Sequence, residues 1–299
     1  MTVSSSNLPL LSGLGEIADR YDVVLSDVWG VVHNGKAAFP GACDALTRFR
    51  ARGGAVILIT NAPRPFPPIL EQLHQLGAPQ SAFDGIITSG DVTLNYVIER
   101  GAAPLHHIGP PRDLTFFDIL AEQTGVRPPL VSVEEADYVL CTGLFNDADT
   151  PEDYARTLDV MRARKLDFIC ANPDLVVHVG DVMLYCAGAV AQRYEDMGGR
   201  VLQAGKPFAP IYDGALAMAQ RLRGAPLDLR RVLAIGDALR TDVKGACDRG
   251  LDALFVTKGI HRDELHPEAK GGALDAQAMD ALVAASGLRP LAAIPDLVW

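Results

Sequence analysis

Carboxylate side chains follow two apolar segments of this sequence. Asp27 comes directly after the segment Asp22–Ser26, and Asp237 comes directly after Val232–Gly236, with Asp242 five residues further on. Carboxylate oxygens, completed by a backbone carbonyl and water, are the ligands that Mg²⁺ prefers. A carboxylate can also attack the phosphorus of a phosphoryl group that is held in place, and so form an aspartyl-phosphate. These residues therefore predict phosphoryl-transfer chemistry at a magnesium site.

Hydrogen-bond donors and a cation follow two further apolar segments. Thr60 and Asn61 follow the segment Ala55–Ile59, and Lys206 follows Val201–Ala204 after one glycine. A hydroxyl, an amide and an ammonium group are suited to stabilising phosphoryl oxygens in a transition state. Each of these groups alone is more often a helix cap or a turn residue. All of them together, in this order and with these residue types, indicate one site.

Parallel strands would bring these side chains to one edge of a sheet. The sequence alternates short apolar runs, Gly or Pro breaks and helical periods, which is typical of a doubly wound α/β fold. Such sheets bind ligands at the carboxyl ends of their strands. Helices are expected at Pro67–Leu76 and Pro210–Leu222, and another is expected to begin at Thr150. The expected strands are Asp22–Ser26, Ala55–Thr60, Gly85–Thr88, Val201–Ala204, Val232–Gly236 and Ala253–Thr257, with Leu105–Ile108, Tyr138–Thr142 and Phe168–Ala171 in a second α/β region.

Length and composition narrow the class of protein. A length of 299 residues predicts two domains. Lys and Arg number 27 and Asp and Glu number 37, and the net charge of −10 argues against a nucleic-acid or anionic-membrane surface. The five cysteines are scattered, which favours a reducing compartment. No signal peptide and no apolar run of about 20 residues is recognised. We therefore expect a cytoplasmic protein without nucleic-acid or membrane partners.

The motifs together resemble the haloacid dehalogenase (HAD) superfamily. They are D-x-x-G-V from Asp27, hydrophobic-T-N ending at Asn61, G-K-P from Gly205 and G-D-x-x-x-T-D from Gly236. The resemblance extends over about Tyr21–Gly259. Similarity to the class IIA, NagD-like phosphatases is carried by Gly30–Val31, Phe39–Ala42, Ala171–Asp174, Cys186–Ala189 and a long insert before Gly205.

The resemblance implies metal and catalytic roles for four residues. Asp27 would be the nucleophile and a metal ligand, and Trp29 would supply its backbone carbonyl to Mg²⁺. Asp237 would be a further metal ligand, and Asp242 would orient the metal shell as part of the catalytic group.

The resemblance also implies phosphoryl-binding residues and a domain organisation. Thr60 and Asn61 would bind the phosphoryl group, and Lys206 would pair with its charge during binding and catalysis. A Rossmann-like parallel-sheet core, residues 1–89 and 196–299, would be interrupted by an inserted type-2 α/β cap at residues 90–195 that selects the leaving group. The substrate would be a small phosphorylated metabolite. Caps of this class mediate dimers, so a homodimer through the cap is expected.

Trp29 departs from the family pattern, and three hypotheses follow. Phosphatases of the family have Asp two residues after the nucleophile as the general acid, a role worth about 10²–10⁴-fold in rate. An indole cannot donate that proton usefully. The chain could be a Mg²⁺-dependent phosphatase of small sugar or nucleotide-related phosphomonoesters, using a good leaving group or a substitute acid such as His33. It could be a catalytically weak or inactive phospholigand-binding protein. It could also be a dehalogenase-like hydrolase, since Trp29-Gly30 resembles the aromatic–Gly pair of dehalogenases.

Four further residues are candidates for substrate contacts. Arg64, three residues after Asn61, could bind a second anionic group or be a solvated residue at the start of a helix. His178, Asp181 and Tyr185 lie in a segment that corresponds to the substrate-specificity loop of the cap, although its alternating pattern also fits a plain strand. The neighbouring histidines His106 and His107 lie on an expected strand and point to opposite faces, which argues against a metal pair.

Overall fold

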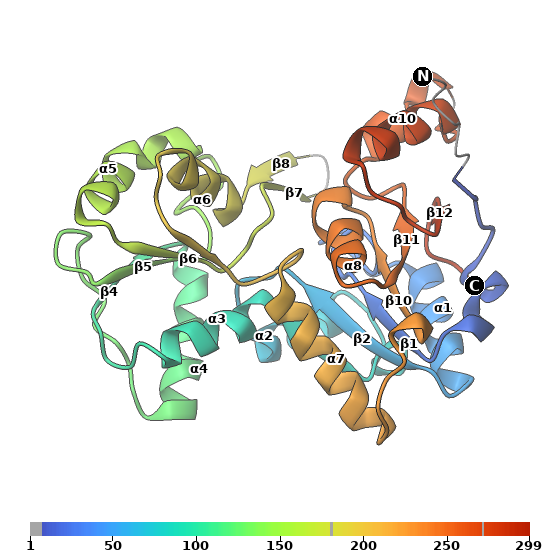
Figure 1. Cartoon of the computed structure of the whole chain (residues 1–299), viewed down its shortest axis with the longest axis horizontal. Coiled ribbons are helices and arrows are strands. Elements are labelled where there is room, and N and C mark those ends of the chain that lie inside the picture. The colour runs from blue at the N-terminus through green and yellow to red at the C-terminus, as the bar shows by residue number, and fades with distance from the viewer. Residues whose placement is uncertain (1–7, 180–181, 271) are drawn as a thin grey trace. The chain divides into compact units, whose positions relative to one another are not determined.

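The computed structural model describes residues 8–179, 182–270 and 272–299, and Figure 1 shows their helices and strands. The chain folds into two compact units. The first unit comprises the residues up to Ile59, Gln72–Ile86 and Tyr212–Trp299, and the second comprises Thr60–Glu71 and Ile87–Ile211. The chain therefore passes between the units more than once along its length.

The larger sheet belongs mainly to the first unit and has the strand order β12-β11-β10-β1-β2-β3. From β12 to β2 each strand pairs in parallel with the next. Every residue of β1, β2 and β10 is buried, as expected where helices cover both faces of a parallel sheet. The strands are β1 (Val23–Ser26), β2 (Ala55–Thr60), β3 (Gly85–Thr88), β10 (Val232–Gly236), β11 (Asp252–Val256) and β12 (Ala292–Ile294).

Helices follow these strands along the chain. Helix α1 begins at Pro40, where a missing N–H costs nothing because the first turn has no acceptor for it. Helix α10 is capped by the Asp275 carboxylate, which accepts from the N–H groups of Gln277 and Ala278. The helices are α1 (Pro40–Ala51), α2 (Phe66–Gln75), α7 (Ala209–Arg223), α8 (Lys244–Asp248), α9 (Arg262–Leu265) and α10 (Ala276–Ser286), together with a π-helical turn, η7 (Leu239–Val243).

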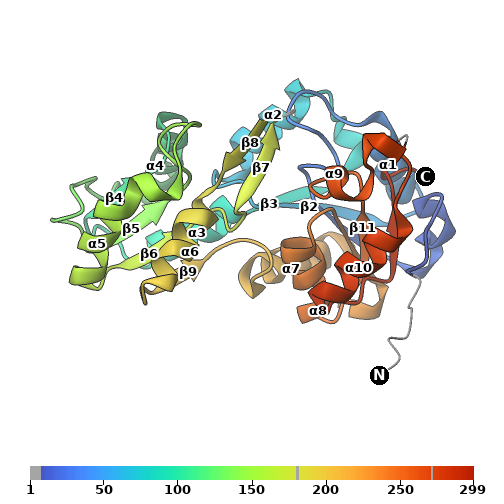
Figure 2. The same cartoon turned by 90° about the horizontal axis from the view of Figure 1, so that it is seen from above.

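The second unit contains a four-stranded parallel sheet with the order β4-β5-β6-β9. Figure 2 shows the antiparallel hairpin β7–β8 as a separate pair of strands. The strands are β4 (Leu105–Ile108), β5 (Tyr138–Cys141), β6 (Asp167–Cys170), β7 (Val176–Val179), β8 (Val182–Tyr185) and β9 (Val201–Gln203). The helices are α3 (Ser89–Ile98), α4 (Thr115–Thr124), α5 (Ala155–Arg164) and α6 (Ala187–Asp196).

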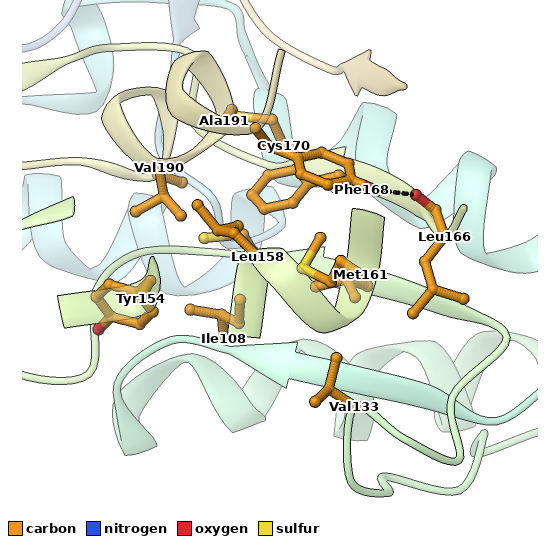
Figure 3. Packing of buried hydrophobic residues seen from close by; sticks show 14 of the residues in the cluster. Ile108, Val133, Tyr154, Leu158, Met161, Leu166, Phe168, Cys170, Val190 and Ala191 are labelled. Atoms are coloured by element: carbon orange, nitrogen blue, oxygen red, sulfur yellow. Dashed lines mark hydrogen bonds between the residues drawn. The ribbon is translucent and has the colours of Figure 1, made fainter. Parts of the chain in front are cut away.

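Alternate residues of β5 enter two different cores of the second unit. Val139 and Cys141 pack with residues of α5 and α6, whereas Tyr138 and Leu140 pack with residues of α3 and α4. Figure 1 shows these helix pairs on opposite faces of the sheet. Figure 3 shows the first of these cores, in which Leu158, Met161 and Val190 surround Phe168. Burial on both faces explains why these strands are continuous apolar runs in the sequence.

Short 3-10 turns connect several of these elements. Thr150 and Asp153 form a reciprocal cap at the start of η5, which leads into α5, so the helix expected to begin at Thr150 is present as a 3-10 turn followed by an α-helix. The 3-10 turns are η1 (Leu14–Glu16), η2 (Ala18–Arg20), η3 (Gln80–Ala82), η4 (Pro111–Leu114), η5 (Pro151–Tyr154), η6 (Leu229–Arg231) and η8 (Glu268–Lys270).

The α/β class and the parallel core sheet are confirmed, but one strand was assigned to the wrong sheet. The expected strand Val201–Ala204 is β9, which pairs with β6 in the second sheet and not with the core strands. Apolar periodicity identifies a strand without identifying its partner, and this is the physical reason for the error. The second compact unit extends to Ile211, whereas the predicted cap is residues 90–195. That cap boundary stays a prediction.

The helices were compared with the requirements of a membrane span. Among the residues that the structure describes, no helix combines the length and the apolar composition that crossing a bilayer would need.

Candidate active site

Three buried acids meet in the first unit. Asp27 directly follows β1, Asp237 directly follows β10, and Asp242 lies in the π-helical turn η7. Each side chain offers a carboxylate oxygen, and the three oxygens lie within 4.8 Å of one another. All three residues are buried, with exposed fractions of 4% to 6%. The parallel strands β1 and β10 are neighbours, so their carboxyl ends bring together acids that are more than 200 residues apart in the sequence.

Backbone N–H groups hold these acids in place. The N–H of Asp27 donates to the carbonyl of Ile235 over 2.8 Å, which continues the ladder between β1 and β10 by one residue. One oxygen of Asp237 accepts from the N–H of Ile260 over 2.6 Å. One oxygen of Asp242 accepts from the N–H of Ala238 over 3.0 Å. Backbone N–H groups therefore orient the carboxylates of Asp237 and Asp242, and the ladder between β1 and β10 fixes the main chain at Asp27.

Two glycines leave room for the Asp237 carboxylate. Gly30 has a φ of +85°, and a Cβ there would lie 2.1 Å from an oxygen of Asp237. A Cβ at Gly259 would lie 1.9 Å from the same oxygen. Any other residue at either position would collide with the carboxylate. The glycine of the D-x-x-G-V motif is thus required both by its left-handed backbone and by this close approach.

The three acids are a suitable set of ligands for a divalent cation. Two carboxylates less than 5 Å apart repel each other by roughly 3 kcal/mol at an effective dielectric constant of about 20. Burial adds a cost to each charge unless a partner compensates it. A hard divalent cation is bound by oxygen ligands and would remove both penalties. The buried, all-oxygen donor set therefore fits the metal that the resemblance implies.

The predicted phosphoryl-binding residues lie in the second unit. Thr60 is the last residue of β2, and its hydroxyl accepts from the N–H of Ala62 over 3.2 Å. Asn61 and Lys206 are each 3% exposed, so both polar side chains are buried. Lys206 follows β9 and precedes Pro207 in a cis peptide bond.

The side chain of Asn61 binds the backbone of Lys206. Its Oδ1 accepts from the N–H of Lys206 over 2.7 Å, and its Nδ2 donates to the carbonyl of Lys206 over 3.2 Å. The second hydrogen of Nδ2 points to the Asp174 carboxylate, 2.9 Å away. A primary amide has two N–H donors, and both are used here. The observed role of the Asn61 side chain is therefore to position Lys206, and its predicted direct contact with a phosphoryl group stays a prediction.

Asp174 is a residue of this group to which the sequence assigned no role. It belongs to the segment Ala171–Asp174, which follows β6, and its own N–H donates to Oδ1 of Asn172 over 3.0 Å. The Asn-Pro-Asp sequence after an apolar run is a turn signal of the kind that could have drawn attention to it. A Cβ at Gly205 would lie 2.2 Å from Oδ1 of Asn61, so the glycine of the G-K-P motif permits the contact with Asn61.

A solved structure of high similarity decides the family. It is a hydrolase of the haloacid dehalogenase-like family from Brucella suis 1330, with 45% sequence identity and a TM-score of 0.83. The match covers 96% of this chain and 100% of that chain. The chain belongs to the haloacid dehalogenase-like hydrolase family. Two family models agree: one described as haloacid dehalogenase-like hydrolase matches residues 24–120, and one described as HAD-hydrolase-like matches residues 203–283.

Two curated relatives within this family are phosphatases. D-glycerol 3-phosphate phosphatase of Mycobacterium tuberculosis (strain ATCC 25618 / H37Rv) is 27% identical over 82% of this chain. That match spans 65% of the relative, slightly less than two thirds of its length. Ribonucleotide monophosphatase NagD of Escherichia coli (strain K12) is 25% identical over 79% of this chain and 88% of its own length. The resemblance to NagD-like members of the family, drawn from the motifs, is thereby confirmed.

Trp29 is held by the loop that follows β1. Its indole meets the imidazole of His33 edge to face, with ring centroids 4.9 Å apart. The N–H of Gly30 donates to the carbonyl of His33 over 2.8 Å. A Cβ at Gly35, where φ is +81°, would lie 2.7 Å from two carbons of the indole. This HAD-family chain therefore has a fixed indole, without an ionisable proton, at the position where the resemblance implies a general acid.

His33 is a poor substitute for that acid. Burial lowers the pKa of its imidazole to about 4, because the charged form loses its hydration. At neutral pH the ring is therefore uncharged. Its Nδ1 accepts from the N–H of Gly35 over 3.0 Å, so the single proton is on Nε2. A neutral imidazole at this site is a much weaker proton donor than the carboxylic acid that the family uses.

The remaining predicted contacts lie in the second unit. Arg64 precedes α2, and its Nε lies 3.8 Å from Oδ1 of Asp113. Tyr185 ends β8 and is 42% exposed. His178 is on β7, where its backbone pairs with Met183, but its side chain lies outside the described part of the chain. Asp181 lies outside the described residues. The substrate contacts predicted for His178, Asp181 and Tyr185 stay predictions.

Proposed function

We propose that this HAD-family hydrolase is a Mg²⁺-dependent phosphatase of small phosphomonoesters and that it works through an aspartyl-phosphate on Asp27. The observation that carries the proposal is the buried cluster of Asp27, Asp237 and Asp242. The names of the two relatives, which act on glycerol 3-phosphate and on ribonucleotide monophosphates, support a small sugar or nucleotide-related substrate.

The proposed reaction has two displacement steps. A carboxylate oxygen of Asp27 attacks phosphorus, the bond to the ester oxygen breaks, and the leaving group departs with the electron pair. Water then displaces the Asp27 carboxylate from phosphorus, which releases inorganic phosphate and restores the enzyme. A divalent cation held by Asp27, Asp237 and the Trp29 carbonyl would neutralise charge on the phosphoryl oxygens, with Asp242 orienting its shell.

Lys206 and Thr60 are proposed to supply the other interactions of this reaction. Lys206 is proposed to pair with the phosphoryl charge, and Thr60 to bind a phosphoryl oxygen. The hydrogen bonds of Asn61 to the backbone of Lys206 support this proposal, because a cation contributes most when it is held in position before the reaction begins. Since Trp29 cannot protonate the leaving oxygen, substrates whose leaving group is stable as an anion are expected to react fastest.

Trp29 also favours a second candidate function. In this alternative, the protein binds a metal and a phosphorylated ligand but turns over slowly or not at all. The dehalogenase hypothesis is less well supported, because hydrolytic dehalogenation at a carboxylate nucleophile needs no cluster of three buried acids. A homodimer through the cap and a cytoplasmic location stay predictions from the sequence.

A phosphate-release screen separates these functions. The protein is incubated with Mg²⁺ or with EDTA and with glycerol phosphates, nucleoside monophosphates or 4-nitrophenyl phosphate, and inorganic phosphate is measured. The phosphatase proposal predicts release that depends on the metal. Ligand-dependent thermal stabilisation without release would replace it by the binding protein. Halide release from haloacids in EDTA would instead support the dehalogenase.

A further inference from the structure

A polar network lies at the carboxyl ends of two neighbouring strands of the second unit. His107 is the third residue of β4, and Thr142 directly follows β5, which pairs with β4 in parallel. Nε2 of His107 and the hydroxyl of Thr142 are 3.0 Å apart. Carboxyl ends of parallel strands are the places where α/β sheets bind ligands. This network is therefore in a position where a binding site is common, and none of its residues takes part in the proposed chemistry at phosphorus.

The network continues to a buried carboxylate, Asp113. This residue is 3% exposed, and burial raises the pKa of its carboxyl group. A hydrogen bond from Thr142 and the positive charges of Arg64 and then Arg112 act in the opposite direction and favour the ionised form. Arg64 is the nearer cation, with its Nε 3.8 Å from Oδ1 of Asp113. Asp113 therefore holds the Arg64 guanidinium.

The hydrogens of this network have one consistent direction. Since the Thr142 hydroxyl donates to Asp113, its oxygen accepts from Nε2–H of His107. Gly109 makes this approach possible, because a Cβ there would lie 2.0 Å from the Thr142 hydroxyl oxygen. The chain of donors thus runs from His107 through Thr142 to Asp113, and it orients the carboxylate that contacts Arg64.

The backbone around Arg64 is fixed as well. On one side, the carbonyl of Ala62 accepts from the N–H of Gly90 over 3.0 Å. On the other side, the N–H of Phe66 donates to Oδ1 of Asp91 over 3.1 Å. A Cβ at Gly90 would lie 2.2 Å from the carbonyl carbon of Arg64, so this backbone packs tightly against the start of α3. Both the main chain and the guanidinium of Arg64 are therefore positioned in advance.

A structural role alone explains this arrangement poorly. An ion pair with a buried carboxylate gives little net stability compared with apolar side chains of the same size, because the carboxylate of Asp113 loses its hydration. The Arg64 side chain remains 25% exposed, so it is accessible from solvent. Arg64 is also only three residues from Asn61, which is at most about 11 Å of extended chain. Asn61 in turn positions Lys206.

We propose that Arg64 binds a second anionic group of the substrate. The substrates would then be small phosphomonoesters that carry a carboxylate or a second phosphate, and a guanidinium recognises both in a bidentate manner. Asp113, Thr142 and His107 are positioning residues that hold the guanidinium. This inference rests on the proposed function for the place of the first phosphoryl group, and it adds the charge of the remainder of the substrate.

The test compares ligands that differ only in the second charge. Benzylphosphonates, which cannot be hydrolysed, are prepared with a ring carboxylate, a second phosphonate or a neutral carboxamide, at each ring position. Binding to the full-length protein with Mg²⁺ is measured by calorimetry. The expected wild-type preference for the better of the two charged ligands over the amide is about 10- to 100-fold, as for a charge-assisted ion pair. If the carboxylate ligand binds better, the second anionic group of the substrate is a carboxylate. If the bisphosphonate ligand binds better, it is a phosphate.

Variants assign the preference to Arg64. Arg64→Gln is expected to reduce the preference to about one, and Arg64→Lys to an intermediate value because the bidentate fork is lost. The single variant Arg64→Gln leaves the Asp113 carboxylate without this cation and could fail to fold. The double variant Arg64→Gln/Asp113→Asn removes both charges, and its preference should also be about one. The matched control is Arg112→Gln, an arginine next to Asp113 whose side chain is 64% exposed, and it should keep the wild-type preference.

The positioning role has its own measurement. Thr142→Val should weaken the preference several-fold, whereas Thr142→Ser, which keeps the hydroxyl, should restore it. A wild-type preference near one, or a preference that survives in Arg64→Gln and disappears in Arg112→Gln, overturns the inference. These measurements need no turnover, so a failure of the phosphatase proposal would appear separately as the absence of phosphate release.

Discussion

The acid cluster of the first unit and the Arg64–Asp113 pair of the second unit differ in how their charges are balanced. In the first unit, Asp27, Asp237 and Asp242 place three carboxylates within 4.8 Å of one another, and backbone N–H groups donate to Asp237 and Asp242. In the second unit, a cation and a carboxylate of the chain itself face each other, as Arg64 and Asp113 do. A bound cation would lower the repulsion between like charges in a buried place, whereas opposite charges of the chain compensate each other. The three acids are thus suited to holding a metal ion, and the Arg64–Asp113 pair is suited to positioning the Arg64 side chain.

The largest expected effect comes from the nucleophile. Asp27→Asn keeps the shape of the side chain but removes its nucleophilic oxygen, so kcat/KM for phosphate release should fall by at least about 10⁴-fold. Circular dichroism and the melting temperature should show a folded protein. The matched control is Asp44→Asn on α1, whose carboxylate is 53% exposed and pairs with Arg48. Activity retained by Asp27→Asn would remove Asp27 from the mechanism.

The next effect concerns the missing general acid. Trp29→Asp introduces a proton donor, and kcat/KM for alkyl phosphates should rise by about 10²-fold, because their leaving groups need protonation. For 4-nitrophenyl phosphate the gain should be much smaller, since its leaving group departs as a stable anion. An equal gain for both substrates, or no gain for the alkyl phosphates, would contradict the interpretation of Trp29. Trp29→Phe is the control for loss of the indole without gain of an acid.

Mg²⁺ should increase the free energy of unfolding through the three acids Asp27, Asp237 and Asp242. Mg²⁺ at about 100 times its dissociation constant should add about 2.7 kcal/mol to the free energy of unfolding. In Asp237→Asn this gain should largely disappear, while the metal-free variant should be at least as stable as the metal-free wild type because one repulsion is removed. Denaturant unfolding with Mg²⁺ and with EDTA measures both values. Asp113→Asn, in the second unit, should leave the stabilisation by Mg²⁺ unchanged. If Mg²⁺ no longer stabilised Asp113→Asn, the distinction between the metal-binding acids and the Arg64–Asp113 pair would be wrong.

The smallest effect is a pH dependence in the second unit. Burial lowers the pKa of His107 to about 4, and the neighbouring His106 contributes in the same direction. The unfolded chain therefore binds the proton more strongly, so this stability is present above about pH 6.5 and is lost as the pH falls toward 4. From pH 7 to pH 5 the loss should be about 2 kcal/mol.

Substitution shows whether His107 is the source of this loss. His107→Gln should reduce the loss of unfolding free energy between pH 7 and pH 5 by about 2 kcal/mol, because the amide does not titrate, whereas the contribution of His33, whose pKa burial also lowers to about 4, should remain. His74→Gln, at an exposed histidine on α2, should keep the wild-type slope. An unchanged slope in His107→Gln would show that other groups cause the loss.

Much of the fold follows from patterns within single segments. Continuous apolar runs predicted β1, β2 and β10 almost to the residue, because strands buried on both faces admit few polar side chains. The acids Asp27 and Asp237 were predicted as neighbours because each directly follows such a strand. The sheet to which a strand belongs is decided by contacts with segments far away in the chain. This is why β9 was assigned to the core although it pairs with β6.

The roles of individual polar residues were harder to predict than their presence. The side chain of Asn61 binds the backbone of Lys206 and the carboxylate of Asp174, contacts that no motif indicated, while its predicted contact with a phosphoryl group stays a prediction. Arg64 and Asp113 are 49 residues apart, and no motif connects them, yet they form an ion pair. A hydrogen bond or an ion pair forms only when the distance between its two atoms is right to within a few tenths of an ångström. That distance is set only when the helices and strands pack against one another.

The sequence by itself therefore determined the family, the strand ends and the residue types that could do chemistry, since each depends on local order along the chain. Only the tertiary structure decided how close and how buried the three acids are, that an asparagine holds the backbone of a lysine, and that an arginine pairs with a buried aspartate. Those facts depend on which parallel strands are neighbours and on how closely their loops approach, and both are consequences of packing between distant segments.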